Sequence, residues 1–240
     1  MFNLNFFSKK SVKNPFEGFT DFHSHILPGV DDGVADMEDS LAILDVYEQR
    51  GFTDVWLTPH IMEEVPNTPA GLKAVFAELC AAYKGGIRLH LAAENMIDNL
   101  FLERLESGEL LPIGADGDML LVETSFFQPP LDLENTLESI RSKGLTPVLA
   151  HPERYNYIDT LDRYRRLTQM GVKLQMNVFS LVGQYGPVVR KKAEDIAAAG
   201  LYTYAGTDIH RRRQLPLLDM KHFHRRHVDI IEAIKARGLS

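Results

Sequence analysis

The sequence of 240 residues contains one cysteine, Cys80, so no internal disulfide can form. A single cysteine is typical of proteins in a reducing cytoplasm. No apolar run approaches the roughly 20 residues that a membrane-spanning helix needs. The first residues, MFNLNFFSKKS, place the apolar part before the basic part, the reverse of a secretory signal. We therefore expect a cytoplasmic protein with no membrane span, in which residues 1–18 form an N-terminal leader.

The sequence also lacks the features of several function classes. Its formal net charge is −7, which argues against nucleic-acid binding, because phosphate backbones favour a basic protein face. No Gly-rich P-loop, G-x-S-x-G or C-x-x-C motif is present. Gly86 stands six residues after Cys80, where cysteine-dependent phosphatases have arginine. Cys80 lies on the apolar stripe of a helical pattern, and we expect it in the core.

Apolar, β-prone runs of strand length recur along the chain without a linker between them. They are GFTDFH, DVWLTPH, IRLHLAAEN, MLLVETS, TPVLAHP, VKLQMNV and LYTYAGTD. Helical spacing separates most of them, at about residues 37–48, 72–83, 133–140 and 188–197, and a last helix is expected at about 229–235. Alternating strands and helices predict a parallel α/β fold, here one domain over residues 19–240.

A polar side chain stands at the end of each predicted strand. The seven residues are His23, His60, Glu94, Glu123, His151, Asn177 and Asp208. Carboxyl ends of parallel strands gather on one face of a β/α barrel, whereas an open sheet would spread them along an edge. The pattern therefore favours a closed or nearly closed barrel of seven strands, with these side chains in one basin.

The stretch DFHSHILPGVDDG adds further metal-ligand types to this basin. His23 and His25 are two residues apart at a strand end, so both rings can face one metal. The Pro- and Gly-containing loop can then return a carboxylate from Asp31 or Asp32. The last strand repeats the spacing in GTDIH. So many histidines and carboxylates exceed the needs of one ion and predict two or three metals that act on a phosphoryl group.

Other histidines fit structural roles better. His90 falls inside a predicted strand and is expected to be packed or at the surface. The histidines of KHFHRRH, His222, His224 and His227, are expected on the solvated face of a helix.

The motifs DFHSHILPGVDDG, TPHIMEEVPNTP, LVETS, LAHPERY, SLVGQYG and GTDIHRR resemble the polymerase-and-histidinol-phosphatase (PHP) superfamily. They are most similar to its bacterial tyrosine-protein phosphatase branch, which is linked to capsule and exopolysaccharide synthesis. The resemblance runs from about Thr20 to the last helix. It implies a distorted seven-stranded (β/α)7 barrel of the PHP type with three divalent metals, often manganese, although iron or zinc also suits the ligands. It implies hydrolysis of phosphotyrosine on the tail of a polysaccharide-synthesis tyrosine autokinase.

The resemblance also assigns roles to residues of this chain. Three metal sites are implied: His23, His25, Glu94 and Asp208; Glu94, Glu123 and His151; and Asp32, His60 and His210. Arg154 is implied to grip the phosphate, and a second arginine falls among Arg211, Arg212 and Arg213. Asp208 or His210 is a candidate to protonate the leaving oxygen. The chain departs from the branch at Asn95, where a tyrosine is common after the glutamate.

Three rival functions follow from the same residues. A small-molecule phosphomonoesterase of the histidinol-phosphatase kind would share the metal basin. A nuclease is disfavoured by the net charge of −7. A non-catalytic scaffold predicts eroded ligands, yet all nine ligand positions are filled. The sequence leaves the oligomeric state open.

Overall fold

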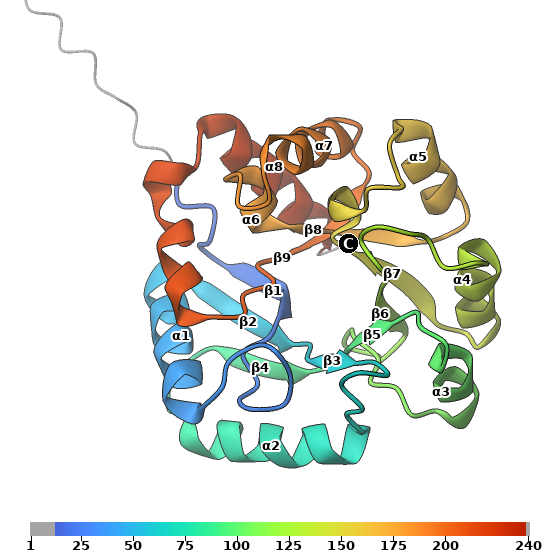
Figure 1. The fold of residues 1–240 in the computed structure, drawn as a ribbon. Coiled ribbons are helices and arrows are strands. Elements are labelled where there is room, and N and C mark those ends of the chain that lie inside the picture. The colour runs from blue at the N-terminus through green and yellow to red at the C-terminus, as the bar shows by residue number, and fades with distance from the viewer. Residues whose placement is uncertain (1–12, 239–240) are drawn as a thin grey trace, which may run out of the picture.

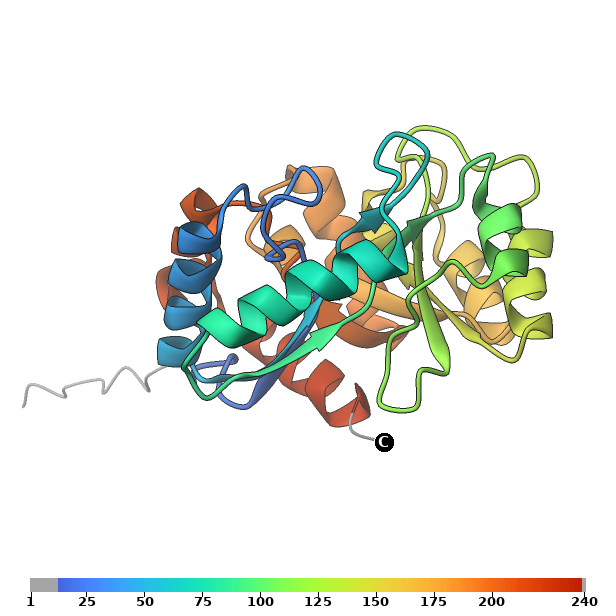
Figure 2. The same ribbon diagram turned by 90° about the horizontal axis from the view of Figure 1, so that it is seen from below.

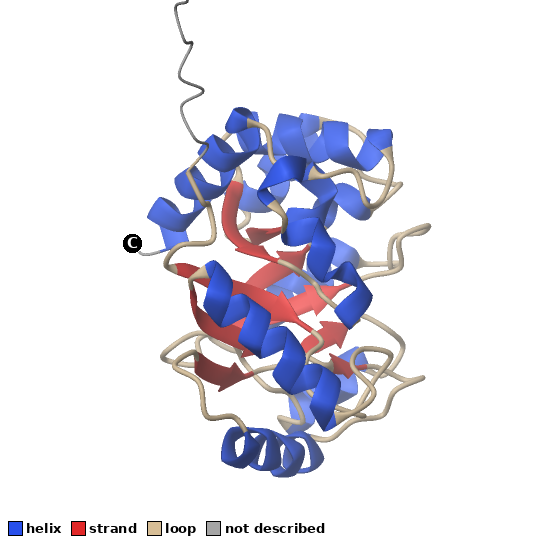
Figure 3. Ribbon diagram, turned by 90° about the vertical axis from the view of Figure 1, so that its left-hand side faces the viewer, coloured by secondary structure: helices blue, strands red, loops and turns tan. Residues whose placement is uncertain are grey.

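A computed structural model describes residues 13–238 of the chain. Helices surround a central set of strands, and Figure 3 shows this division of helices outside and strands inside. The strands are β1 (Phe19–Ser24), β2 (Phe52–Leu57), β3 (His60–Ile61), β4 (Arg88–Leu91), β5 (Glu94–Met96), β6 (Met119–Glu123), β7 (Thr146–Ala150), β8 (Lys173–Asn177) and β9 (Tyr202–Gly206).

The eight α-helices among the described residues form the ring seen in Figure 1. They are α1 (Met37–Arg50), α2 (Pro69–Ala82), α3 (Phe101–Ser107), α4 (Leu133–Ser142), α5 (Leu161–Gln169), α6 (Val178–Leu181), α7 (Pro187–Ala198) and α8 (Arg225–Gly238). The 3₁₀ helices are η1 (Pro152–Arg154), η2 (Arg212–Leu218) and η3 (Met220–His222). The five predicted helices are α1, α2, α4, α7 and α8, whereas α3, α5 and α6 were not predicted.

The strands pair only in parallel within two sheets, which confirms the predicted α/β class. One sheet has the order β1-β2-β4, and the other has the order β3-β5-β6-β7-β8-β9. A single closed barrel of seven strands is therefore not confirmed. A parallel bridge between Ser24 and Ile209 joins the ends of the two sheets just beyond β9.

Two of the seven predicted strands are each divided into two. DVWLTPH becomes β2 and β3, separated by Thr58 and Pro59, and IRLHLAAEN becomes β4 and β5, separated by Ala92 and Ala93. Pro59 has no N–H to donate to a ladder, which favours a break at that point. The Glu94 N–H instead lies within hydrogen-bonding reach of the Thr58 and Pro59 carbonyls, at 3.3 and 3.1 Å. One break therefore lies directly before His60, and the other lies directly before Glu94.

The first helix has the ends that its sequence predicts. The Asp36 side chain accepts a hydrogen bond from the Asp39 N–H and caps the N-terminus. Gly51 ends the helix at φ 93°, in the left-handed region that glycine enters without strain. The chain enters β2 directly after this C-terminal cap. The loop that follows β1 and the loop that follows β3, in blue and teal, lie on the same side of the molecule in Figure 2.

The core extends into the predicted leader. Phe16 is fully buried and packs on Phe19, Phe52 and Phe223 at ring-centroid distances of 5.2–5.8 Å. Residues 1–12 of the leader lie outside the described residues, and the domain boundary at residue 18 stays a prediction. Within residues 13–238, no helix has the length and apolar character required to cross a membrane.

Two expectations about burial are wrong. Cys80 lies on α2 as predicted, but its side chain is exposed, because the buried stripe of that helix passes through Leu72 and Leu79 instead. His227, expected on a solvated helix face, is fully buried in the first turns of α8 beside Glu194. Its Nε2 lies 3.3 Å from the Glu194 carboxylate, which supplies the polar partner that a buried imidazole needs.

Candidate metal centre

The structure brings all nine predicted ligands to one place. They lie at or just after the carboxyl ends of β1, β6, β7 and β9, at the starts of β3 and β5, and in the loop after β1. These residues form four overlapping groups. Within each group, one nitrogen or carboxylate oxygen atom per residue lies within 4.8 Å of the others. The groups are His25, Asp32, His60 and His210; His23, His25 and Glu94; His23, His151 and Asp208; and His60, Glu94 and Glu123.

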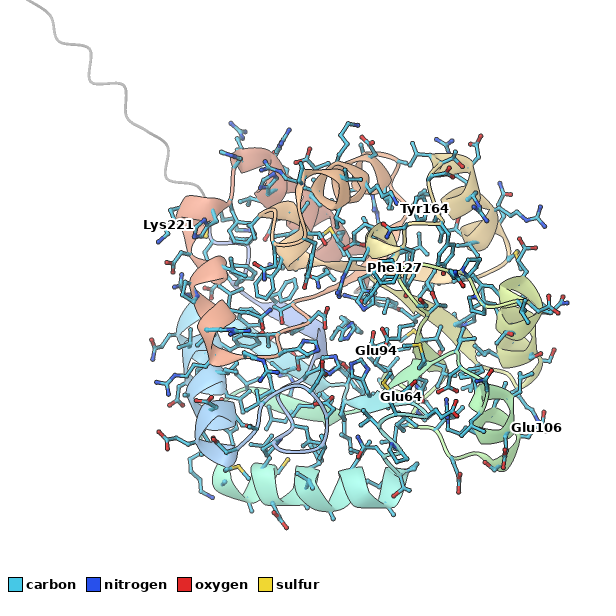
Figure 4. All side chains as sticks on the ribbon, viewed as in Figure 1. Glu64, Glu94, Glu106, Phe127, Tyr164 and Lys221 are labelled. Carbon is cyan, nitrogen blue, oxygen red and sulfur yellow. The ribbon has the colours of Figure 1, made fainter. Side chains whose placement is uncertain are left out.

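Glu94 is the centre of this cluster, and Figure 4 shows it in the middle of the ring of elements. Its carboxylate lies 3.2 Å from His23 Nε2 and 3.3 Å from both His25 Nε2 and His60 Nδ1. Its other oxygen lies 2.9 Å from His151 Nε2. Burial favours the neutral acid, but the surrounding histidines, led by His23, hold the pKa of Glu94 well below its usual value. Glu94 is therefore an anion shared among four rings.

Asp208 is the second shared carboxylate. Its Oδ1 lies 3.4–3.5 Å from ring nitrogens of His23, His25 and His210. Its Oδ2 accepts hydrogen bonds from Arg154 and Asn177, at 2.8 and 2.9 Å. Burial alone would raise the pKa of Asp208, but the nearby histidines and Arg154 hold it well below the usual range.

Among the residues that the structure describes, backbone strain falls on two of these predicted ligands. His151 has φ 33° and Asp208 has φ 53°, and no other non-glycine residue in the described chain has positive φ. Residues held in this region cost on the order of 1–3 kcal/mol and cluster at functional sites. The fold therefore fixes these two side chains in directions that a relaxed strand end would not give.

The two aspartates of the VDDG turn have different positions. The Asp31 side chain is buried, lies 2.8 Å from His25 Nδ1, and accepts from the backbone N–H groups of Gly33 and His60. The Asp32 side chain is 66% exposed, and its Oδ1 lies 3.5 Å from Nε2 of both His60 and His210. The structure thus selects Asp32 as the residue that faces the cluster. Asp31 instead orients His25, as outer carboxylates do for ligating histidines.

Gln175 has a similar orienting position that the sequence did not reveal. Its Oε1 lies 3.0 Å from His23 Nδ1 and accepts from the His151 N–H at 3.3 Å. It is fully buried in the middle of β8. The available signal was the polar residue at the centre of VKLQMNV, where polar and apolar residues alternate. Asn95, at the departure from the branch pattern, points away and donates to the Ala93 and Leu121 carbonyls.

Arg154 lies at the edge of the cluster between two aromatic rings. Its guanidinium carbon is 4.2 Å from the centroid of Phe126 and 4.3 Å from that of Tyr185. Its side chain is 19% exposed and bonds to Asp208. Cation–π contacts with two rings restrict the orientation of the guanidinium plane. Neither aromatic residue was predicted as part of the site.

A buried acid, Glu153, anchors the turn that carries Arg154. Glu153 accepts from the Asn177 N–H, the Ser180 hydroxyl and the Tyr202 hydroxyl, at 2.8–2.9 Å. Burial raises its pKa above the usual value. Glu153 therefore ties the turn that carries Arg154 to β8, α6 and β9.

The three arginines that follow GTDIH make different contacts. Arg211 donates to the Asp32 carbonyl at 3.0 Å, so it lies beside a predicted ligand. Arg212 reaches Asp39 at 3.4 Å, on α1. Arg213 is exposed and makes no ion pair with any residue that the structure describes. Of the three, Arg211 is the best placed to meet a group in the cluster.

The donor set fits divalent cations. Among residues 13–238, five buried side-chain nitrogen or oxygen atoms lack a hydrogen-bond partner, and three belong to predicted ligands: His60 Nδ1, His151 Nδ1 and Asp208 Oδ1. The Nε2 atoms of His23 and His25 also face each other at 3.1 Å. Buried polar atoms are rarely left unpaired, so convergent unpaired nitrogen and oxygen atoms indicate a position for a cation.

Acidic neighbours raise the pKa values of two of the histidines, His25 and His60. Burial by itself would lower the pKa of His25, but Asp31 and Glu94 raise it to about 10. Burial likewise opposes protonation of His60, but Asp32, Glu123 and Glu94 raise its pKa to about 12. In the absence of metal, both rings are protonated at neutral pH and partly neutralise the carboxylates.

Comparisons with known proteins agree with this arrangement. The sequence profile of a family described as "Capsular polysaccharide synthesis, CpsB/CapC" matches residues 19–226. "Tyrosine-protein phosphatase YwqE" of Bacillus subtilis (strain 168) is 29% identical over 195 residues, which is 79% of this chain and 76% of that protein. "Tyrosine-protein phosphatase CpsB" of Streptococcus pneumoniae is 28% identical over 214 residues, which is 82% of this chain and 84% of that protein.

A solved structure has the same fold. It is described as one of "YwqE from Bacillus subtilis and CpsB from Streptococcus pneumoniae, unique metal-dependent tyrosine phosphatases". It superposes with a TM-score of 0.76 at 24% identity, and the match covers 92% of this chain and 94% of the other. The resemblance inferred from the motifs is confirmed: with a profile match across residues 19–226, this chain belongs to the CpsB/CapC family of capsular polysaccharide synthesis.

Proposed function

We propose that this chain is a metal-dependent protein-tyrosine phosphatase. The observation that carries the proposal is the convergence of nine nitrogen and oxygen ligands around Glu94, with Arg154 at their edge. The relatives that share the fold and most of the chain are named tyrosine-protein phosphatases. The physiological substrate that we propose is a phosphotyrosine-bearing tyrosine autokinase of polysaccharide synthesis, reached in the cytoplasm.

We assign three divalent cations, manganese first, to the cluster. Their proposed ligands are His23, His25, Glu94 and Asp208; Glu94, Glu123 and His151; and Asp32, His60 and His210. Pairwise distances support the second site, since His151 lies 2.9 Å from Glu94 and 4.0 Å from Glu123. The groups of neighbouring ligand atoms cover all nine residues but overlap: His25 also joins Asp32, His60 and His210, His60 also joins Glu94 and Glu123, and His151 also joins His23 and Asp208. The absence of thiolate from the set suits manganese, iron or zinc. We also propose that the two sheets act as one distorted barrel, since the Ser24–Ile209 bridge connects them next to the cluster.

The side chains around the cations have separate tasks. Bound cations would supply Lewis-acid charge for the phosphoryl oxygens and would lower the pKa of a bound water. Arg154 can bind two phosphoryl oxygens with parallel N–H bonds. Asp208 is ionised at neutral pH and has no proton to give, because its pKa lies far below the usual range. We therefore assign to Asp208 the orientation of Arg154 rather than proton donation.

A small-molecule phosphomonoesterase is the second candidate, because it would use the same cluster. The deciding experiment compares turnover of a phosphotyrosine peptide with turnover of histidinol phosphate by the metal-loaded protein. We expect kcat/KM to favour the peptide, and both activities to vanish after chelation. Preference for histidinol phosphate would reject the tyrosine-phosphatase assignment and leave the metal centre intact.

Replacement of Cys80 is expected to leave activity intact. Cys80 is exposed on α2, which contributes no residue to the cluster, and partial desolvation by its neighbours raises rather than lowers the pKa of its thiol. A thiol with a raised pKa is a poor nucleophile at neutral pH. We expect Cys80→Ser to retain at least about half of the wild-type kcat/KM, and a chelator to abolish it. Activity that survives chelation but is lost with Cys80 would reject metal catalysis.

Metal binding is expected to release protons. Histidine must be neutral to ligate, yet the folded-state pKa values of His25 and His60 are raised to about 10 and about 12. Their raised pKa values stabilise the metal-free fold fully below the unfolded value of about 6.5, and for His25 this stabilisation is lost as pH rises through about 10. Between pH 7 and 9, metal affinity should therefore rise and the Tm difference between loaded and metal-free protein should widen. Calorimetry in two buffers of different ionisation enthalpy measures the release; identical heats in both would contradict it.

A further inference from the structure

One short stretch of this acidic chain is dense in positive charge. Residues 209–227 contain six arginine and lysine side chains and a single carboxylate, Asp219, so they carry +5 in a chain of net charge −7. The six are Arg211, Arg212, Arg213, Lys221, Arg225 and Arg226, and we refer to them as the basic strip. An asymmetry of this size indicates a surface for an anionic partner.

The basic strip is accessible and only partly neutralised. All six side chains are exposed. Lys221 and Arg226 pair with Asp219 and Glu194, at 3.3 and 2.7 Å. In the part of the chain that the structure describes, Arg211, Arg213 and Arg225 form no ion pair. The strip therefore keeps unpaired positive charge at both ends.

The basic strip begins at the metal centre. Arg211 follows the predicted ligand His210 directly and donates to the carbonyl of Asp32. The segment then runs beside α1 along the left-hand edge of Figure 1 to the start of α8, and Lys221 is labelled at that edge in Figure 4. Arg50 of α1 fixes it by bonding to the Leu218 carbonyl and the Asp219 carboxylate. A polypeptide substrate that extends from the cluster along this segment would contact Arg211 first.

We propose that the basic strip binds acidic side chains that flank the phosphotyrosine in a polypeptide substrate. The inference rests on the proposed function and adds the substrate class: tyrosines in aspartate- and glutamate-rich segments. Opposite charges at an exposed surface act mainly on encounter and on KM, and salt screens them over about 8–10 Å. The strip should therefore discriminate between peptides and have no effect on a small aryl phosphate.

An anionic membrane is the other surface that such charge could meet. Helices that lie on membranes combine a basic face with large apolar side chains. In the described chain, the exposed large apolar residues are Leu100, Leu102, Phe127, Leu131 and Val188, and none lies in the basic strip. The absence of an apolar face within the strip and its contact with the metal centre favour the acidic polypeptide.

The test reverses charge at two strip positions that lack an ion pair, and at two exposed arginines elsewhere. The double variant Arg213→Glu/Arg225→Glu is compared with Arg141→Glu/Arg165→Glu, which makes the same charge change on the exposed faces of α4 and α5. Substrates are a phosphotyrosine peptide with acidic flanks, one with neutral flanks, and para-nitrophenyl phosphate. We expect the first variant to lose about tenfold in kcat/KM on the acidic peptide, through KM, and less than about twofold on the other two. The control should lose less than about twofold on all three.

A binding measurement separates this proposal from the proposed function. Fluorescence anisotropy of the acidic peptide, carrying a non-hydrolysable phosphonate in place of phosphate, should give tighter binding to wild type than to the strip variant, and the difference should shrink with salt. This result would support the strip even if no peptide were turned over. Equal affinities, or an equal loss in the control variant, would overturn it. Retention on phosphatidylserine vesicles that the strip variant loses, with unchanged peptide binding, would overturn it in favour of a membrane surface.

Discussion

Replacing Glu94 with glutamine is expected to reduce kcat/KM on a phosphotyrosine peptide by at least about 1000-fold, because a metal centre contributes several kcal/mol to stabilising a phosphoryl transition state. The amide has the same shape, but it removes the charge shared by His23, His25, His60 and His151. Under the proposed assignment two cations lose a ligand at once. Metal content, peptide turnover and the far-ultraviolet circular dichroism spectrum should be measured on the same sample.

The control for this change is Asp54→Asn. Asp54 is another largely buried carboxylate, near the start of β2, where it bonds to Arg88 and His90 and lies outside every ligand group. We expect the control to keep its metal and activity within about threefold, even if it melts at a lower temperature. Near-normal turnover by Glu94→Gln, with metal restored to wild-type content, would remove Glu94 from the centre.

Replacing Arg154 with alanine is expected to reduce kcat/KM by roughly 30- to 1000-fold, because charge-assisted hydrogen bonds in a dry site are worth about 2–4 kcal/mol. Phe126 and Tyr185 hold the guanidinium in place before substrate arrives. If the interaction strengthens in the transition state the loss falls on kcat, and if it is equal in both states it falls on KM. Metal content should be unchanged, since Arg154 is not a ligand.

Arg154→Lys is the informative companion. Lysine keeps the charge but cannot form two parallel N–H bonds or fill the space between two rings, so it should recover only part of the activity. Metal stoichiometry and kcat/KM should be measured for both variants. A loss below about threefold in Arg154→Ala would assign Arg154 a structural role. The phosphate contact would then pass to Arg211, which already reaches the Asp32 carbonyl.

The location of the cluster was predictable from sequence because strand polarity alone decides it. Polar residues that end parallel strands must meet on one face, so His23, Glu94, Glu123 and His151 could be placed together without knowledge of any contact. The choice between Asp31 and Asp32 was not predictable, since both lie in one turn and only the folded loop shows which one faces His60 and which one bonds to His25 Nδ1.

Other features depended on tertiary packing. Gln175, Phe126 and Tyr185 act on the cluster through neighbours distant in sequence. Only Gln175 had a local signal, as a polar residue inside a predicted strand, and that signal does not show which group it contacts. The two divided strands break just before His60 and just before Glu94, and only the missing N–H of Pro59 marks one of these breaks in the sequence. The burial of Cys80 was misjudged because a helix with apolar residues on a wide arc does not reveal which edge faces the core.

Anomalous diffraction from crystals of the manganese-loaded protein tests the central claim most directly. We predict three manganese peaks, each within about 2.0–2.6 Å of its proposed ligands, and a Glu94 oxygen shared between two of them. Crystals of Glu94→Gln soaked in the same way should lose at least one of these peaks. An active, metal-loaded protein whose manganese peaks lie away from His23, Glu94, His151 and Asp208 would contradict the account.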